Sequence, residues 1–127
     1  MSKIKRVTLQ EYKYQLDDFG PNIATYTSGV DMEVSKFVVT IETEDGLRGS
    51  YAPHYGATSH ALAQISAMAP ELIGLRAEQR ELIFERLKIS FRHFDKTGIA
   101  ALDVALWDLA GKKYDASISQ LLGGYRQ

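Results

Sequence analysis

The stretch from Gly98 to Gly111 constrains the fold more than any other part of the sequence. A helix over these residues would be apolar on nearly every side, and Asp103 and Asp108 are its only charged interruptions. Such a helix is buried inside a protein. It is also shorter than the roughly 20 residues that a membrane span needs. We therefore predict a central helix built on Ile99, Leu102, Val104, Ala105, Leu106, Trp107 and Leu109.

The sequence of this central helix also predicts how the helix begins, ends and packs. Thr97 is placed to cap its first turn, and Gly111 permits it to end. Asp103 and Asp108 must find partners, because an unpaired buried carboxylate is costly. The alanines between them permit close approach of neighbouring elements. Four large side chains are expected in the core: Leu102, Leu106, Trp107 and Leu109.

Three stretches within the first 52 residues have the pattern of strands. Apolar and polar residues alternate from Ile4 to Leu16, with one slip of phase after Ile4 that indicates a bulge. Residues 34–43 are β-branched and aromatic, and Glu44-Asp45-Gly46 follows them. Asp-Gly between two such runs predicts a tight hairpin into a third strand over 47–52. The three strands form a small antiparallel meander.

A sheet this small needs cover on one face, and the rest of the chain is helical. We expect a first helix from Thr58 or Ser59 to Pro70, a second over 77–90, the central helix, and a last turn over 117–122. On the second helix Leu82, Ile83, Leu87 and Phe91 recur at helical spacing. The predicted class is therefore α+β, a three-stranded antiparallel meander followed by a helical bundle.

Two loops hold the candidate binding residues. Residues 17–31 are rich in turn formers, and a loop of that length inside a compact domain is uncommon unless it works as a lid or binding segment; a disordered spacer is the alternative. The second loop follows the third strand and joins Tyr51, His54 and Tyr55. Their hydroxyls and imidazole can hydrogen-bond a polar ligand, and His54 can titrate near neutral pH. The alternative is that the tyrosines anchor the loop and His54 is only exposed.

Composition excludes several kinds of partner and chemistry. Fifteen Lys and Arg against sixteen Asp and Glu leave a net charge of -1, so we expect no nucleic acid and no anionic membrane as partner. The sequence lacks cysteine, which excludes disulfides and thiolate metal sites. The close carboxylate pairs, Asp17 with Asp18 and Glu42 with Glu44, are interpreted as solvated surface. The first ten residues do not resemble a signal peptide, so we expect a cytoplasmic protein.

The central helix also carries a recognisable motif. Residues 105–112 read A-L-W-D-L-A-G-K, and residues 121–124 read L-L-G-G. With the preceding order of strands and helices, this resembles the N-terminal capping domain of the mandelate racemase and muconate lactonizing enzyme group, in the enolase superfamily. The resemblance extends over residues 1–127. Packing explains the motif, so we interpret it as structural and assign no catalytic residue in this chain.

The resemblance implies a two-domain enzyme in which this domain covers a (β/α)8 barrel. That barrel holds a divalent metal, usually Mg²⁺, on three carboxylates, and also carries the Lys or His bases. A barrel takes roughly 250 residues, so it is absent from these 127 residues, and we expect this chain alone to be inert and to bind no metal. The implied partners are the protein's own C-terminal barrel, a small carboxylate substrate, and further copies in a homo-oligomer.

The family's chemistry is abstraction of the proton next to a carboxylate, followed by racemisation, dehydration or cycloisomerisation. The resemblance places two specificity loops on residues 17–31 and 51–56, so we expect Tyr26, Tyr51, His54 and Tyr55 to face the substrate. Hydroxyls and imidazole suit a hydroxylated acid, which favours a sugar acid dehydratase. The alternatives are a racemase or cycloisomerase, or a non-enzymatic binding module that reuses the fold.

Overall fold

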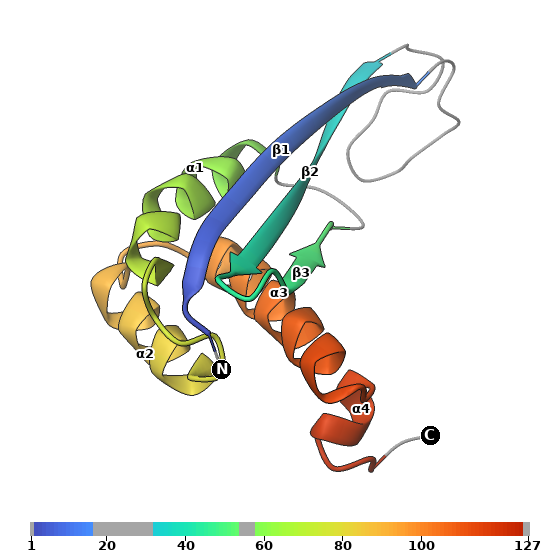
Figure 1. Cartoon of the computed structure of the whole chain (residues 1–127). Helices are drawn as coiled ribbons and strands as arrows, with labels where there is room; N and C mark the ends of the chain where they lie inside the picture. The colour runs from blue at the N-terminus through green and yellow to red at the C-terminus, as the bar shows by residue number, and fades with distance from the viewer. Residues whose placement is uncertain (1, 17–31, 54–57, 126–127) are drawn as a thin grey trace.

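The computed structural model describes residues 2–16, 32–53 and 58–125 (Figure 1). A three-stranded antiparallel sheet in the order β1-β2-β3 lies against helices, which confirms the predicted α+β meander. The elements are β1 (Ile4–Leu16), β2 (Met32–Thr43), β3 (Arg48–Tyr51), α1 (Thr58–Met68), the 3-10 turn η1 (Ala69–Leu72), α2 (Arg80–Ser90), α3 (Thr97–Tyr114) and α4 (Ile118–Leu121).

The two long strands, β1 and β2, form a curved ribbon that extends past the helices (Figure 1). Their register runs from Ile4 opposite Thr43 to Leu16 opposite Met32, with an irregularity between Ile4 and Arg6. That irregularity is the bulge indicated by the slip of phase.

A tight turn joins β2 to β3. The Thr43 N–H donates to the Leu47 carbonyl at 3.0 Å, and Gly46 has a φ of +84°. Glycine reaches this left-handed conformation without the strain that a side chain would cause. The predicted hairpin at Asp45-Gly46 is therefore confirmed.

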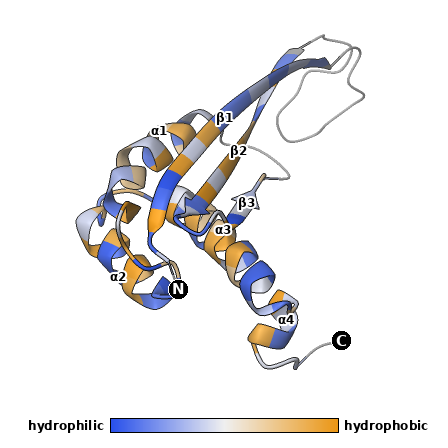
Figure 2. Ribbon diagram, viewed as in Figure 1, coloured by the Kyte–Doolittle hydropathy of each residue, from blue (hydrophilic) through white to orange (hydrophobic). Residues whose placement is uncertain are grey.

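The core lies between one face of the sheet and helices α1, α2 and α3. Side chains from all these elements are at most 2% exposed, including Phe37, Ile41, Ile65, Ile83 and Leu106. In Figure 2 the middle of α3, beside β3, is coloured as hydrophobic. α3 contacts β2, β3, α1 and α2, so it has the predicted central position. Within the described ranges, no helix combines the length and the apolar character needed to cross a membrane.

The prediction that α3 is buried all round is wrong in part. Leu102, Leu106 and Leu109 are at most 1% exposed, but Val104 is 39% exposed and Trp107 is only half-buried. The Arg80 guanidinium of α2 covers the indole, 4.1 Å from the ring centroid. Because the sheet and the other helices cover one side of α3, its opposite side stays open. Leu82 of α2, expected on the buried face, is likewise 55% exposed.

The ends of α3 also differ from the prediction. Asp95, rather than the Thr97 side chain, caps the first turn, since its carboxylate accepts from the Thr97 N–H at 2.8 Å. This bond is the main cause that lowers the Asp95 pKa from 3.8 to about 2. The helix continues past Gly111 to Tyr114 and ends at Asp115, which has a φ of 50°. Gly111 does not end the helix, because the turn after it still forms the backbone hydrogen bonds of a helix.

Candidate functional site

The candidate site lies where β3 ends and the chain passes toward α1. Of the four residues expected to face substrate, only Tyr51 falls within the described ranges; Tyr26, His54 and Tyr55 lie outside them. Tyr51 is the last residue of β3 and pairs with Val39 of β2. The described geometry of the site is therefore that of β3 and of the contacts that hold it.

Tyr51 is partly buried against the core. Its ring meets the Phe37 ring edge-on, with centroids 6.5 Å apart and planes at 69°. Edge-to-face packing of this kind orients an aromatic ring as well as burying it. The contact makes Tyr51 an anchor for the end of β3.

Gly49 brings β3 into close contact with α3. A Cβ built on this glycine would lie 2.2 Å from the Ala105 carbonyl oxygen and 2.5 Å from the Leu109 backbone nitrogen. These are backbone atoms that cannot move aside independently of the helix. The position therefore requires glycine, and the alanine of the A-L-W-D motif permits the approach as predicted.

Two polar side chains of α3 bind the backbone of β3. The Asp108 Oδ2 accepts from the Ser50 N–H at 2.8 Å, and the Lys112 Nζ donates to the Arg48 carbonyl at 3.1 Å. Lys112 also donates to Asp108 at 2.6 Å. The prediction that Asp108 must find a partner is confirmed. Its partner is the strand beside the candidate site.

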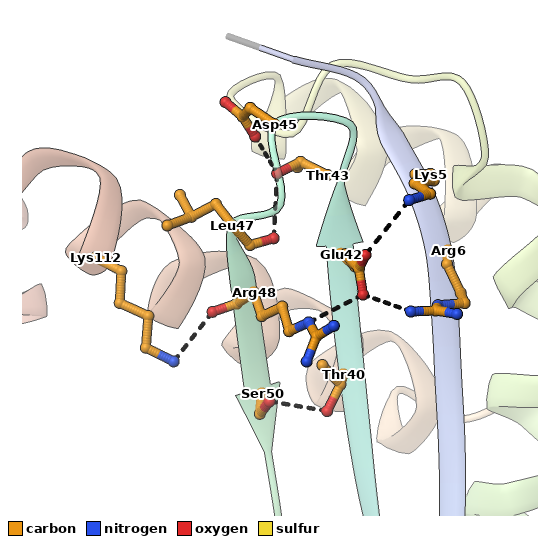
Figure 3. A network of polar contacts seen from close by, with 10 residues as sticks. All are labelled: Lys5, Arg6, Thr40, Glu42, Thr43, Asp45, Leu47, Arg48, Ser50 and Lys112. Atoms are coloured by element: carbon orange, nitrogen blue, oxygen red, sulfur yellow. Dashed lines mark hydrogen bonds and ion pairs between the residues drawn. The ribbon is translucent and has the colours of Figure 1, made fainter.

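On the outer face of the sheet, Glu42 lies among three cations (Figure 3). Its carboxylate is 2.7 Å from the Arg6 guanidinium, 2.9 Å from that of Arg48 and 3.7 Å from the Lys5 Nζ. The hydrogen bond from Arg6 is the main cause that lowers the Glu42 pKa. Next to this group the hydroxyls of Thr40 and Ser50 bond at 2.8 Å.

The interpretation of Glu42 as solvated surface is wrong, since the residue is 7% exposed. The register explains why: Glu42 of the middle strand stands opposite Arg6 of β1 and Arg48 of β3, so cations flank it from both sides. Cross-strand pairs of opposite charge stabilise a sheet. The sequence analysis paired Glu42 with Glu44 and with neither arginine, because the arginines come beside Glu42 only through the register of the three strands.

A second polar group ties the start of α1 to the start of α3. Gln64 of α1, 8% exposed, accepts from the Gly98 N–H at 2.8 Å and donates to Asp95 at 3.1 Å. One turn earlier, His60 lies 3.6 Å from Asp95. Both β3 and α1 are thus bonded to α3 or to the residues just before it.

These residues do not fit a divalent metal ion. Among residues 2–16, 32–53 and 58–125, no three His, Asp or Glu side chains gather as a metal site would require. The carboxylates of Glu42 and Asp108 already have cationic side chains as partners. What the described arrangement does is position the end of β3 against α3.

Comparison with known proteins decides the family. Residues 20–123 match the N-terminal domain of the mandelate racemase / muconate lactonizing enzyme family. The chain belongs to this family. The A-L-W-D-L-A-G-K and L-L-G-G segments that carry the resemblance fall almost entirely within the matched range.

Several characterised relatives have this domain. The chain is 37% identical to D-galactarolactone cycloisomerase of Agrobacterium fabrum over 68% of its length, and 35% identical to the hydrophobic dipeptide epimerase of Enterococcus faecalis over 97%. A crystal structure of dipeptide epimerase from Enterococcus faecalis, complexed with Mg and the dipeptide L-Leu-L-Tyr, matches 97% of the chain at 30% identity with a TM-score of 0.75. The 3,6-anhydro-D-galactonate cycloisomerase of Zobellia galactanivorans matches 99% at 27% identity with a TM-score of 0.77.

The chain spans between about a quarter and a third of these proteins. It covers 24% of the Agrobacterium protein, 35% of the Enterococcus protein and 33% of the Zobellia chain. The reactions in the relatives' names therefore belong to proteins about three times as long as this chain.

Proposed function

We propose that this chain, residues 1–127, is the substrate-specificity cap of a Mg²⁺-dependent enzyme that removes the proton next to a carboxylate of a sugar-derived acid. The observation that carries the proposal is the family match over residues 20–123, together with the names of two of the relatives, which are cycloisomerases of sugar-derived acids. The barrel, with the metal ligands and the base, belongs to the remainder of such an enzyme. Copies of the whole enzyme assemble into a homo-oligomer in the cytoplasm.

The surface of α3 supports a cap rather than a free-standing binding module. Its outer side carries an apolar stripe at helical spacing, which we call the outer stripe and which consists of Ala100, Val104, Trp107, Gly111 and Tyr114. Val104 and Tyr114 are 39% and 54% exposed. In α4, Ile118 and Leu122 at its end add exposed apolar surface. A free-standing module is expected to present a polar surface, whereas contiguous apolar surface marks a place where another domain or protein sits.

Dehydration and cycloisomerisation share the first step, so the cap is compatible with either. Hydroxyl and imidazole groups in residues 17–31 and 51–56 favour a hydroxylated acid, as a sugar acid dehydratase or a sugar acid cycloisomerase would take. The relatives' names favour cycloisomerisation. In the proposal Tyr26, Tyr51, His54 and Tyr55 contact the part of the substrate distant from the reacting carbon.

A second candidate is epimerisation of a dipeptide. It is supported by the 35% identity to the Enterococcus epimerase, whose crystal structure holds Mg and a dipeptide. This reaction also removes a proton next to a carbonyl group. The two candidates therefore differ in substrate and not in the nature of the first step.

The test is proton exchange, because it reports the first step whatever follows. The protein encoded by the complete gene would be incubated in D2O with Mg²⁺ and a panel of sugar acids, sugar lactones and dipeptides, and loss of the α-proton signal followed by NMR. Products then separate the reactions: a keto-deoxy acid indicates dehydration, a cyclised isomer that has lost no water indicates cycloisomerisation, and a diastereomeric dipeptide indicates epimerisation. Absence of exchange with every substrate, in a folded and metal-loaded protein, would overturn the proposal.

A further inference from the structure

The free edge of β3 is covered by side chains of α3 instead of by another strand. Among the described residues β3 is the last strand of the sheet, so its backbone groups on the side away from β2 have no strand partner there. Arg48 and Ser50 are alternate residues, and their groups point to the same edge. Asp108 accepts from the Ser50 N–H and Lys112 donates to the Arg48 carbonyl.

We propose that Asp108 and Lys112 are positioning residues that hold β3, and with it Tyr51 at the end of the strand, in the place that substrate selection requires. The pair is called the edge clamp below. Its effect on β3 follows from geometry alone. Its effect on substrate selection rests on the proposed function.

The edge clamp is a closed set of three hydrogen bonds. One Asp108 oxygen, Oδ2, accepts from both Ser50 and Lys112, at 2.8 and 2.6 Å, and Lys112 returns to the Arg48 carbonyl at 3.1 Å. Bonds in which one partner is charged are stronger than neutral ones. Between the two clamped groups lies Gly49, whose Cα packs on the backbone of α3. β3 is therefore attached to α3 both at its edge and on its inner face.

The clamp acts close to the candidate site. Among the described residues, the one expected to face the substrate is Tyr51, which directly follows Ser50 at the end of β3. Holding Ser50 against α3 therefore fixes the backbone that carries Tyr51.

The alternative is that Asp108 and Lys112 form an ordinary surface ion pair within α3. Pairs four residues apart stabilise a helix slightly whatever lies beside it. An ion pair within α3 needs both charges and predicts no specific effect on β3. The edge clamp instead needs an acceptor for the Ser50 N–H, and in Asp108→Asn the amide oxygen still supplies one.

Hydrogen exchange of the 127-residue chain separates the two roles. In Asp108→Ala we expect the Ser50 amide to exchange about 10- to 100-fold faster, since a partly buried donor loses a charged acceptor, while amides of α1 keep their rates. Asp108→Asn should restore the Ser50 rate to within about threefold of wild type. The matched control is Asp103→Ala, the same change on the side of α3 that faces Arg80 and Glu81 of α2, and it should leave Ser50 unchanged.

An unchanged exchange rate of the Ser50 amide in Asp108→Ala overturns the proposal. So does a uniform increase of the exchange rates of all amides that Asp108→Asn does not reverse. If Asp108→Ala does not fold, Lys112→Met supplies the test: it keeps the acceptor for Ser50 and frees the Arg48 carbonyl. The expected result is then faster exchange confined to β3, and no change in β3 overturns the proposal.

The effect on selection is measured in the complete enzyme. We expect Asp108→Asn to leave the ratio of kcat/KM between two accepted acids near its wild-type value, and Asp108→Ala to change it at least about fivefold, mainly through KM. A fall of kcat alone, equal for both substrates, overturns the positioning role. If the wild-type enzyme acts on no acid, the proposed function fails, while the exchange experiment still decides whether the clamp holds β3.

Discussion

Both sides of α3 carry apolar residues, but their environments are opposite. On the inner side Leu102, Leu106 and Leu109 are at most 1% exposed under the sheet. On the outer stripe Val104 and Tyr114 are 39% and 54% exposed, and Trp107 is half-buried under Arg80. The inner side has its partner within this chain. On the outer side, the Arg80 guanidinium lies over Trp107.

This difference shows that, when a helix is apolar on every side, its sequence does not predict which residues pack within the chain. Burial of apolar area is favourable wherever it occurs, so a stripe that is left exposed in one domain is suited to burial against another. In the proposed enzyme the remaining domain supplies that second surface. Substitutions on the two sides should therefore behave differently in the chain and in the complete protein.

The largest expected effect is on the inner side. Leu106→Ala should destabilise the 127-residue chain by about 2 to 5 kcal/mol, because it leaves a cavity between α3 and the sheet. The measurement is urea denaturation followed by circular dichroism. A loss below about 1 kcal/mol would contradict the central position of α3.

Gly49→Ala tests the contact of α3 with β3. The added Cβ would meet backbone atoms at 2.2 and 2.5 Å, so we expect a cost of about 3 kcal/mol, at the upper end of what overpacking usually produces. The matched control is Gly74→Ala, where a Cβ meets no atom within 4 Å but the φ of +82° still disfavours alanine. If Gly49→Ala costs no more than this control, the close approach does not determine the position of β3.

Trp107→Ala should have an intermediate effect, about 1 to 2 kcal/mol in the chain alone, since the indole is only half-buried and its cation–π contact with Arg80 is worth little near the surface. Full burial, as the sequence suggested, would give about 3 to 5 kcal/mol. Arg80→Gln separates the two contributions because it removes the cation and leaves the indole. Denaturation curves of both variants decide between these values.

A smaller effect is expected from acid at the start of α3. The Asp95 carboxylate has a folded pKa of about 2 against 3.8 when unpaired, so the stability that it contributes is present above pH 3.8 and is lost as the pH falls toward 2. Asp95→Asn should flatten the fall of the melting temperature over this range. An equally steep fall in the variant would mean that other carboxylates, such as Asp45 with its pKa also lowered to about 2, account for it.

The smallest effect is expected on the outer stripe. Val104→Ala should change the stability of the chain by less than about 0.5 kcal/mol, because the valine is exposed and alanine favours the helix. In the complete protein the same change should cost about 1 to 2 kcal/mol if a second domain covers the stripe. Equal small effects in both would show that the stripe stays exposed.

The sequence predicted those features that depend on neighbours along the chain. The bounds of β1 were predicted as they are found, and the turn at Gly46 followed from a residue that tolerates positive φ. The bulge after Ile4 was visible as a slip of one residue in an alternating pattern. The candidate residues Tyr26, His54 and Tyr55 were chosen from composition and resemblance, and their role stays a prediction.

The features that sequence reasoning missed depend on partners distant in the chain. Glu42 was interpreted as solvated because its cations come from β1 and from the far side of the hairpin, and only the register brings them together. Asp108 and Lys112 were assigned to a packing motif, whereas their bonds go to β3, about 60 residues earlier in the sequence.

The sequence by itself determined the α+β class, the order of the elements and the central place of α3, because periodicity, turn residues and hydrophobic pattern are properties of local chain segments. Only the tertiary structure decided which side of α3 is buried, that Trp107 lies under Arg80, and that Asp108 holds the edge of β3. The physical reason is that burial and ion pairing depend on what packs against a residue, and a pattern that is apolar on every side is compatible with several such packings.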